Sequence, residues 1–145
     1  MIRTMASKKS YLDHLRNVTL FSGCSTRDLE KIARASDEIT VEGGHVITDQ
    51  GQTGREAFVI LEGSATVRRN GKKVATLGAG SVVGELSLLD HGPRTATVIT
   101  DGPTTLLVID QRHFAGVLDS VPAIAHKLLA SLASKIREFD RAYYG

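Results

Sequence analysis

The spacing of hydrophobic and polar residues divides the chain into a helical start, a strand-rich middle and a helical end. Near the N-terminus, apolar residues three or four positions apart predict a short helix over residues 10–18. Ser25, followed three positions later by Asp28, is the pattern of a helix N-cap and predicts a second helix directly after it. Residues 1–9 are mostly polar and are expected to form a flexible N-terminus.

Between residues 39 and 109 the apolar residues occur in short runs separated by glycine-bearing turns, as in a strand-rich fold. Asn70-Gly71 is a strong hairpin signal, because both residues tolerate the positive φ angles that a two-residue turn needs. About eight strands are predicted, over residues 39–41, 45–48, 57–61, 65–67, 74–77, 82–83, 95–100 and 104–109. Their number and close spacing favour a jelly-roll barrel.

The last third of the chain returns to a helical period. A short helix is expected over residues 111–118, and Pro122 is well suited to begin a longer one that runs to about Tyr144. The long helix carries an apolar stripe that packs on the barrel, dimerises or closes over a ligand. The predicted fold is therefore mainly β with flanking α: an eight-stranded jelly-roll barrel, N-terminal helices, and a short plus a long C-terminal helix. Residues 10–145 are expected to form a single domain.

Composition limits the classes of function. The chain of 145 residues has 41% hydrophobic and 23% charged residues, which is typical of one ordered globular domain. A net charge of +2 gives no indication of a nucleic-acid or membrane partner. The single cysteine, Cys24, excludes a disulfide framework and points to a cytoplasmic location. No segment resembles a signal peptide or a membrane span.

One segment carries candidate chemistry, from Gly84-Glu85-Leu86 to Arg94-Thr95-Ala96. Only a brief helical turn fits between the strands on either side of it. The N-terminal amides of such a turn attract an anion, and an arginine adds a planar set of donors to the same anion. The carboxylate of Glu85 would repel a bare phosphate but would accept a hydrogen bond from a ribose hydroxyl. The combination suits a sugar phosphate.

The segment resembles the phosphate-binding cassette of cyclic-nucleotide-binding domains, which occur in catabolite-activator regulators and in regulatory subunits of cyclic-AMP-dependent protein kinase. The Gly-Glu-Leu and Arg-Thr-Ala motifs match at the family's spacing, although Val83 stands where the family often has phenylalanine. Glycines in the preceding turns also match, and the resemblance covers roughly residues 11–144.

The resemblance implies roles for individual residues. Arg94 would pair with the exocyclic phosphate oxygen, and Glu85 would accept the ribose 2′-hydroxyl. Backbone amides of the same segment would complete the site. The implied ligand-binding residues are Gly84, Glu85, Leu86, Ser87, Arg94, Thr95 and Ala96.

The sequence does not determine which base, adenine or guanine, the bound nucleotide carries. In this family a threonine after the cassette arginine can hydrogen-bond guanine, but it also occurs in bacterial cyclic-AMP binders, so Thr95 leaves both cyclic AMP and cyclic GMP open. The long last helix usually closes over the base. Its lid candidates are Leu132, Lys135, Ile136 and Phe139.

Other kinds of site have weaker support. The same barrel shape occurs in metal-dependent cupins, but none of the five histidines (His14, His45, His91, His113 and His126) lies two residues from another, as a cupin site requires. Glu85 and Arg94 could instead form a structural ion pair. No catalytic residue, metal or cofactor is expected.

The sequence thus predicts a non-enzymatic module that senses cyclic AMP or cyclic GMP and signals by repositioning its C-terminal helices. At 145 residues we expect the output to require another protein or a second copy of this chain, with a homodimer through the last helix as one arrangement. The alternatives are an interaction or dimerisation module with a vestigial nucleotide pocket, and a small jelly-roll metal enzyme.

Overall fold

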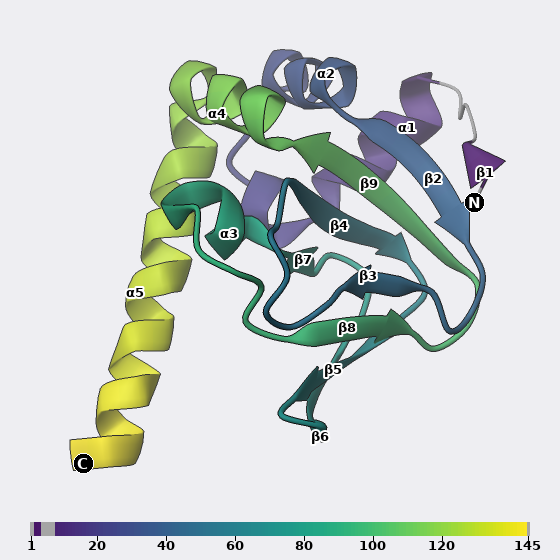
Figure 1. Cartoon of the computed structure of the whole chain (residues 1–145). Helices are drawn as coiled ribbons and strands as arrows, with labels where there is room; N and C mark the ends of the chain where they lie inside the picture. The colour runs from purple at the N-terminus through teal and green to yellow at the C-terminus, as the bar shows by residue number, and fades with distance from the viewer. Residues whose placement is uncertain (1, 4–7, 145) are drawn as a thin grey trace.

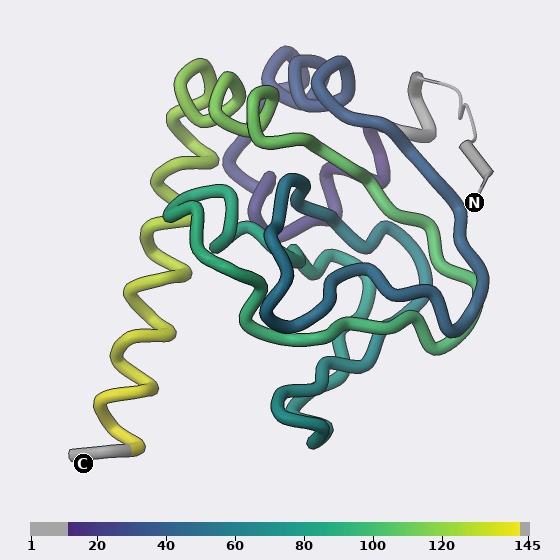
Figure 2. The backbone as a smooth tube through the Cα atoms, viewed as in Figure 1, coloured from purple at the N-terminus to yellow at the C-terminus, as the bar shows by residue number. Residues whose placement is uncertain are grey.

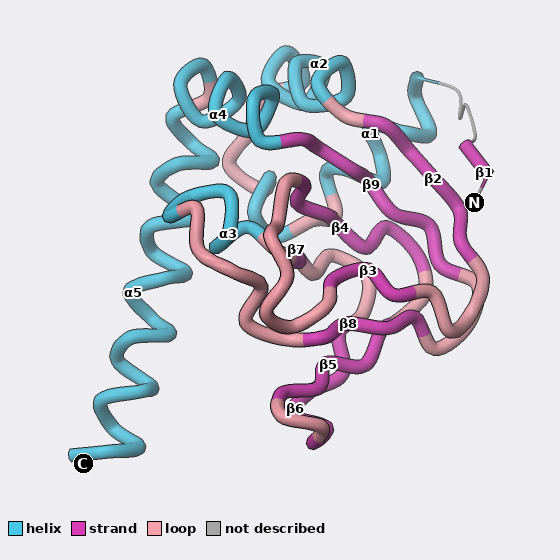
Figure 3. Tube along the Cα trace, viewed as in Figure 1, coloured by secondary structure: helices cyan, strands magenta, loops and turns pink. Residues whose placement is uncertain are grey.

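A computed structural model describes residues 2–3 and 8–144 of the chain. Helices gather at one side of the molecule and strands fill the other (Figures 1 and 3). The helices are α1 (Lys8–Arg16), the 3-10 turn η1 (Thr19–Phe21), α2 (Thr26–Ala35), α3 (Glu85–Asp90), α4 (Gln111–Ser120) and α5 (Pro122–Tyr144).

The strands form two antiparallel sheets. Strands β1 (Ile2–Arg3), β2 (Asp37–Val41), β9 (Thr104–Asp110), β4 (Glu56–Glu62) and β7 (Val82–Val83) make the first, in that order. Strands β3 (Val46–Thr48), β8 (Thr97–Thr100), β5 (Ala65–Arg69) and β6 (Lys72–Leu77) make the second. All eight predicted strands are present as β2–β9. The sheets do not join into the closed barrel that we expected, and they pack as two layers.

Strands β4 and β9 carry two hydrophobic cores, one on each face. Phe58 and Ile60 of β4 face the second sheet and pack there with Val67 and Val98. Alternate residues of β4 point to the helical side, as the two-residue period of a strand requires. This second core contains Ala57, Val59, Leu61, Leu107 and Ile109 from the strands, together with Leu15, Leu29, Phe114, Val117 and Ile124 from the helices.

The local sequence signals explain the ends of several elements. The Ser25 side chain accepts a hydrogen bond from the Asp28 amide, and Asp28 accepts one from the Ser25 amide, so the predicted N-cap is a complete capping box. Asn70 and Gly71 have φ angles of 54° and 78° and turn β5 into β6, as predicted.

The C-terminal helices follow the prediction closely, since α4 covers residues 111–120 and α5 begins at Pro122. The far half of α5 extends away from the sheets (Figure 2). At the other end, α1 begins at Lys8 and ends at Arg16, two residues before each predicted limit. Of the predicted flexible segment, residues 1 and 4–7 lie outside the described residues, and Ile2–Arg3 pairs with Ile39 and Thr40 of β2.

Candidate functional site

The segment from Gly84 to Ala96, called the cassette below, forms a short helix between two strands. Strand β7 pairs with β4 and delivers the chain to Gly84, whose φ of 83° turns it into α3. At the other end of α3, His91 also has a left-handed conformation, with φ of 59°. A six-residue helix thus occupies the place where the sequence predicts a brief turn.

Arg94 lies at the base of the cassette with 8% of its surface exposed. Its Nη1 donates to the Gly84 carbonyl at 2.8 Å and its Nη2 to the Glu56 carbonyl at 2.6 Å. The guanidinium also lies against Gly54, because a Cβ atom there would be 2.5 Å from its Cζ. Side-chain hydrogen bonds and close glycine contacts therefore fix the guanidinium in place.

The charge of Arg94 has no carboxylate at ion-pair distance among the described residues. Burial lowers the pKa of Arg94, and the more distant carboxylates of Glu56 and Glu85 raise it by less. A buried cation that is paired only with neutral carbonyls favours the approach of an anion.

Glu85, the first residue of α3, is also buried, with 7% of its surface exposed. Its Oε1 lies 3.7 Å from Nζ of Lys135 on α5. The structural ion pair between Glu85 and Arg94, which the sequence left as an alternative, is not formed. Glu85 instead joins the cassette to the C-terminal helix.

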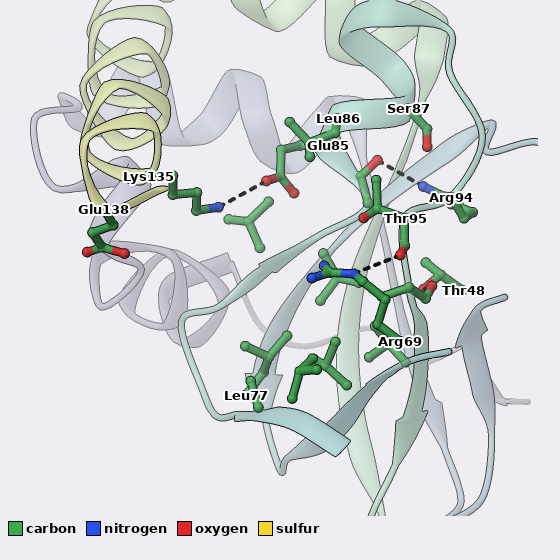
Figure 4. A pocket seen from close by; sticks show the side chains of 18 residues that line it. Thr48, Arg69, Leu77, Glu85, Leu86, Ser87, Arg94, Thr95, Lys135 and Glu138 are labelled. Carbon is green, nitrogen blue, oxygen red and sulfur yellow. Dashed lines mark hydrogen bonds and ion pairs between the residues drawn. The ribbon is translucent and has the colours of Figure 1, made fainter. Parts of the chain in front are cut away.

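A pocket of about 560 Å³ opens beside the cassette (Figure 4). All seven residues that the family resemblance implied line it: Gly84, Glu85, Leu86, Ser87, Arg94, Thr95 and Ala96. Arg94 and Thr95 come from the cassette's far end, and β5, β6 and α5 supply the opposite walls. The structure therefore brings the predicted ligand-binding residues together around one space.

The four lid candidates on α5 divide into two sets. Lys135 lines the pocket, and Leu132 is partly buried against the core on the helical side. Ile136 and Phe139 are 63% and 59% exposed and are not among the residues that line the pocket. Glu138 also lines the pocket, and because it lies three residues after Lys135 the two share one helix face.

Several lining residues were missed by the sequence analysis because they belong to no motif. Thr48 is buried and donates to the Ala96 carbonyl at 3.1 Å. Arg69 on β5 donates through Nε to the Thr95 carbonyl at 3.1 Å. The two-residue period of β5 was the one available signal, since it places Arg69 on the same side as Val67.

The described residues contain no group of three or more His, Cys, Asp or Glu side chains that could hold a metal ion. The histidines have separate surroundings: His91 contacts Gln111, His113 contacts Asp110, and His14 lies 3.3 Å from Glu62. Within the same part of the chain, no helix is both long and apolar enough to cross a membrane.

Several known proteins are similar to this chain. The cyclic AMP receptor protein of Thermus thermophilus is 28% identical over 131 residues, which cover 87% of this chain and 61% of that protein. The crystal structure of the Thermus thermophilus catabolite activator protein superposes with a TM-score of 0.79 and 29% identity, over 85% of this chain and 60% of that one. The chain thus spans about three fifths of the length of the curated relative that it matches.

A regulatory subunit of a cAMP-independent protein kinase A from Trypanosoma brucei has the same fold, with a TM-score of 0.80 and 26% identity over 93% of this chain and 49% of that one. Residues 38–121 match the family described as the cyclic nucleotide-binding domain. This match includes the cassette, both sheets except β1, and α4. The chain belongs to the cyclic nucleotide-binding domain family.

Proposed function

We propose that this chain binds a 3′,5′-cyclic nucleotide with its phosphate against Arg94. The observation that carries the proposal is the buried guanidinium of Arg94, which lacks a carboxylate partner among the described residues and lines a pocket of about 560 Å³. Two of its N–H groups are held by carbonyls, and the others remain for a phosphate oxygen. The amides at the start of α3 add further donors to the same anion.

Glu85 is the proposed acceptor for the ribose. Its carboxylate lines the pocket, and Lys135 lies near only one of its oxygens. The second oxygen can accept a hydrogen bond from the ribose 2′-hydroxyl. A carboxylate at this point favours a nucleotide, because it repels the charge of a phosphate but accepts a hydrogen bond from a neutral ribose hydroxyl.

Cyclic AMP and cyclic GMP are the two candidate ligands. One relative is named for cyclic AMP, and another is a cAMP-independent kinase subunit, so membership of the family does not determine the base. The pocket offers apolar side chains for the faces of a purine, from Val67, Val74 and Leu77. We propose that the chain acts as a sensor and carries out no reaction on the nucleotide.

The signal is proposed to pass from Glu85 to α5. A ligand that engages Glu85 changes the charge environment of Lys135, and with it the relative stability of different positions of α5. Such a ligand acts by shifting the population toward the conformation that it binds best.

The receiver of the signal is proposed to be a second copy of this chain, bound along α5. Leu129 and Ile136 are 64% and 63% exposed and lie seven residues apart, which places them on one helix face. Apolar residues at this spacing are typical of a helix that pairs with another helix. Equilibrium ultracentrifugation of wild type and Ile136→Glu tests this proposal: the wild type is expected to dimerise and the variant to remain monomeric.

The nucleotide proposal is tested by calorimetric titration of the chain with cyclic AMP, cyclic GMP and 5′-AMP. We expect the wild type to bind a cyclic nucleotide. Arg94→Ala should lose about 2–5 kcal/mol of the binding free energy. Arg112→Ala is the control, because Arg112 lies outside the pocket. Unchanged affinity in a folded Arg94→Ala variant would refute the role of Arg94. If the wild type binds neither cyclic nucleotide, the pocket is vestigial and the module serves interaction alone.

A further inference from the structure

Four of the six residues at the turn between β5 and β6 are positively charged. The segment reads Arg68-Arg69-Asn70-Gly71-Lys72-Lys73, and we call it the basic hairpin. The whole chain has a net charge of +2, so without these four cations the remainder has a net charge of −2. The small overall charge thus conceals a strongly positive surface at one turn.

The basic hairpin projects from the molecule as an ordered two-stranded ribbon. In Figures 1 and 2 its turn extends beyond the rest of the second sheet, on the side opposite α2 and α4. All six of its residues are exposed. The Gln50 side chain holds the turn, because its Nε2 donates to Asn70 Oδ1 at 2.9 Å and its Oε1 accepts from the Asn70 amide at 2.8 Å. The cations are therefore carried on a support that loses little backbone entropy when they bind a partner.

The four cations lie on both faces of this ribbon. In the register of β5 and β6, Arg68 is opposite Lys73 and Arg69 is opposite Lys72. Successive residues of a strand point to opposite faces, so each face carries one arginine and one lysine. Like charges directly opposite each other destabilise a pair of strands. The fold therefore gains no stability from this arrangement.

The basic hairpin also lacks a carboxylate that would neutralise it. Among the described residues, none of its four cations has a carboxylate at ion-pair distance. The pKa of Asp101 is lowered mainly by two hydrogen bonds and less by the charge of Lys73. Lysines on an edge strand such as β6 hinder pairing with another sheet, but this does not explain the arginines of β5, which lies inside its sheet. The charges therefore remain available to a partner.

A DNA duplex is the anionic partner that fits cations on both faces of a ribbon. Its major groove admits a two-stranded β-ribbon, and a phosphate backbone runs along each edge of the groove. A membrane or the acidic surface of a protein would meet only one face of the hairpin.

We propose that the basic hairpin enters the major groove of duplex DNA and contacts phosphates on both sides of it. Phosphate contacts position a protein on the duplex without reading its sequence, so the binding is independent of sequence. Arg68, Lys72 and Lys73 do not line the pocket beside the cassette. DNA binding is therefore separate from the proposed binding of a cyclic nucleotide.

Fluorescence anisotropy of a short labelled DNA duplex of mixed sequence tests the proposal, with the whole chain and no cyclic nucleotide. Each phosphate contact releases counterions, so four contacts predict a slope of about −3 to −4 for log affinity against log salt concentration. In Lys72→Gln/Lys73→Gln the affinity should fall about tenfold or more, and the slope should become shallower by about 2. An RNA duplex should bind more weakly, because its major groove is deep and narrow.

Arg27→Gln/Lys127→Gln is the matched control. It removes the same charge from two exposed residues, on α2 and α5, that have no ion pair among the described residues. This variant should bind the DNA duplex like the wild type. Thermal unfolding should show that the hairpin variant is as stable as the wild type or more stable, because its like-charge pairs are relieved.

Several distinct results would overturn the role of the basic hairpin. Absence of binding to the DNA duplex at about 50 mM salt would exclude DNA as the partner. An equal loss of affinity in the hairpin variant and the control would assign binding to overall charge. Equal binding of the DNA and RNA duplexes would exclude insertion into the major groove. Tighter binding to poly-glutamate or to vesicles of anionic phospholipid would identify an acidic protein or a membrane as the partner.

Discussion

The Glu85 carboxylate lies 3.7 Å from the Lys135 ammonium, and this ion pair joins the cassette to α5. Glu85 belongs to α3 and Lys135 lies fifty positions later in the chain. The side chain of Glu85 is 9% exposed, whereas that of Lys135 is 62% exposed. The carboxylate end of the pair is therefore buried, and the ammonium end is open to solvent.

Replacing Lys135 tests whether this ion pair transmits the signal. We expect Lys135→Gln to lower the free energy of unfolding by less than about 1 kcal/mol, because the lysine end is screened by water. In the wild type, a bound cyclic nucleotide should change the hydrogen-exchange protection of α5, and in Lys135→Gln this change should disappear. Lys127→Gln, also on α5 but without an ion pair among the described residues, should respond like the wild type. A full response in Lys135→Gln would contradict the proposed route.

Gly54 tests the position of the Arg94 guanidinium. A Cβ atom at Gly54 would lie 2.5 Å from Arg94 Cζ, so Gly54→Ala should displace the guanidinium while leaving the fold intact. We expect cyclic-nucleotide affinity to fall by about tenfold or more, part of the ~2–5 kcal/mol that loss of a buried charged contact costs. Titration of the nucleotide and thermal unfolding together provide the measurement.

Gly116→Ala is the control for Gly54→Ala. Gly116 lies within α4, and a Cβ atom there has nothing within 4 Å. This substitution should leave nucleotide affinity unchanged and should stabilise the fold by about 0.5–1 kcal/mol, since alanine loses less entropy in a helix than glycine. If both alanine variants bind alike, the close contact at Gly54 has no effect on the site.

The Asp101 carboxylate makes a pH-dependent contribution to the free energy of unfolding. Hydrogen bonds from Thr66 and Ser64, at 2.6 and 2.7 Å, lower the pKa of the Asp101 carboxyl. Because the pKa is lower in the folded state, the stabilisation is present above the unfolded-state pKa of about 3.9 and is lost as the pH falls through the folded-state value. Asp101→Asn should therefore be less stable than the wild type at pH 7, with a difference that shrinks below about pH 4.

Urea unfolding of both proteins between pH 3 and pH 7 measures this difference. Asp140→Asn is the control, because the Asp140 side chain has no hydrogen bond or ion pair to another described residue. A constant difference between Asp101→Asn and the wild type across the range would show that the carboxylate charge is not what stabilises this turn.

Ser25 tests the capping box at the start of α2. Ser25→Ala removes the oxygen that accepts from the Asp28 amide at 3.1 Å, and we expect a loss of about 1 kcal/mol in the free energy of unfolding. Ser134→Ala, at an exposed position inside α5, should change stability by only a few tenths of a kcal/mol. Chemical denaturation measures both. If Ser25→Ala and Ser134→Ala changed the free energy of unfolding equally, the loss would come from helix propensity and not from the capping box.

The sequence predicted most of the cassette because its geometry depends on neighbouring residues. Gly84 supplies a left-handed φ, the short apolar run forms α3, and Arg94 returns to the Gly84 carbonyl ten positions earlier. The Asn70-Gly71 turn was predictable for the same reason, since two adjacent residues determine it.

The parts of the site that could not be predicted depend on tertiary placement. Arg69 reaches Thr95 across twenty-six positions of sequence. The two-residue period of β5 places Arg69 on the same side as Val67, but it does not show that this side lines a pocket. On α5 the lid candidate Lys135 lines the pocket together with Glu138, which was not a candidate, whereas the candidates Ile136 and Phe139 are exposed. Periodicity shows which residues share a helix face but not which face meets the ligand.

Strands β4 and β9 have a buried core on each face, and this limits where the chain can be cut. The family match begins at residue 38, after α1, η1 and α2. A fragment of residues 38–121 would uncover the side of these strands that holds Val59, Leu61 and Leu107. An apolar surface of that kind promotes aggregation. The segment that the family model matches is therefore smaller than the unit that shares these two cores, and the N-terminal helices outside that match are part of the unit.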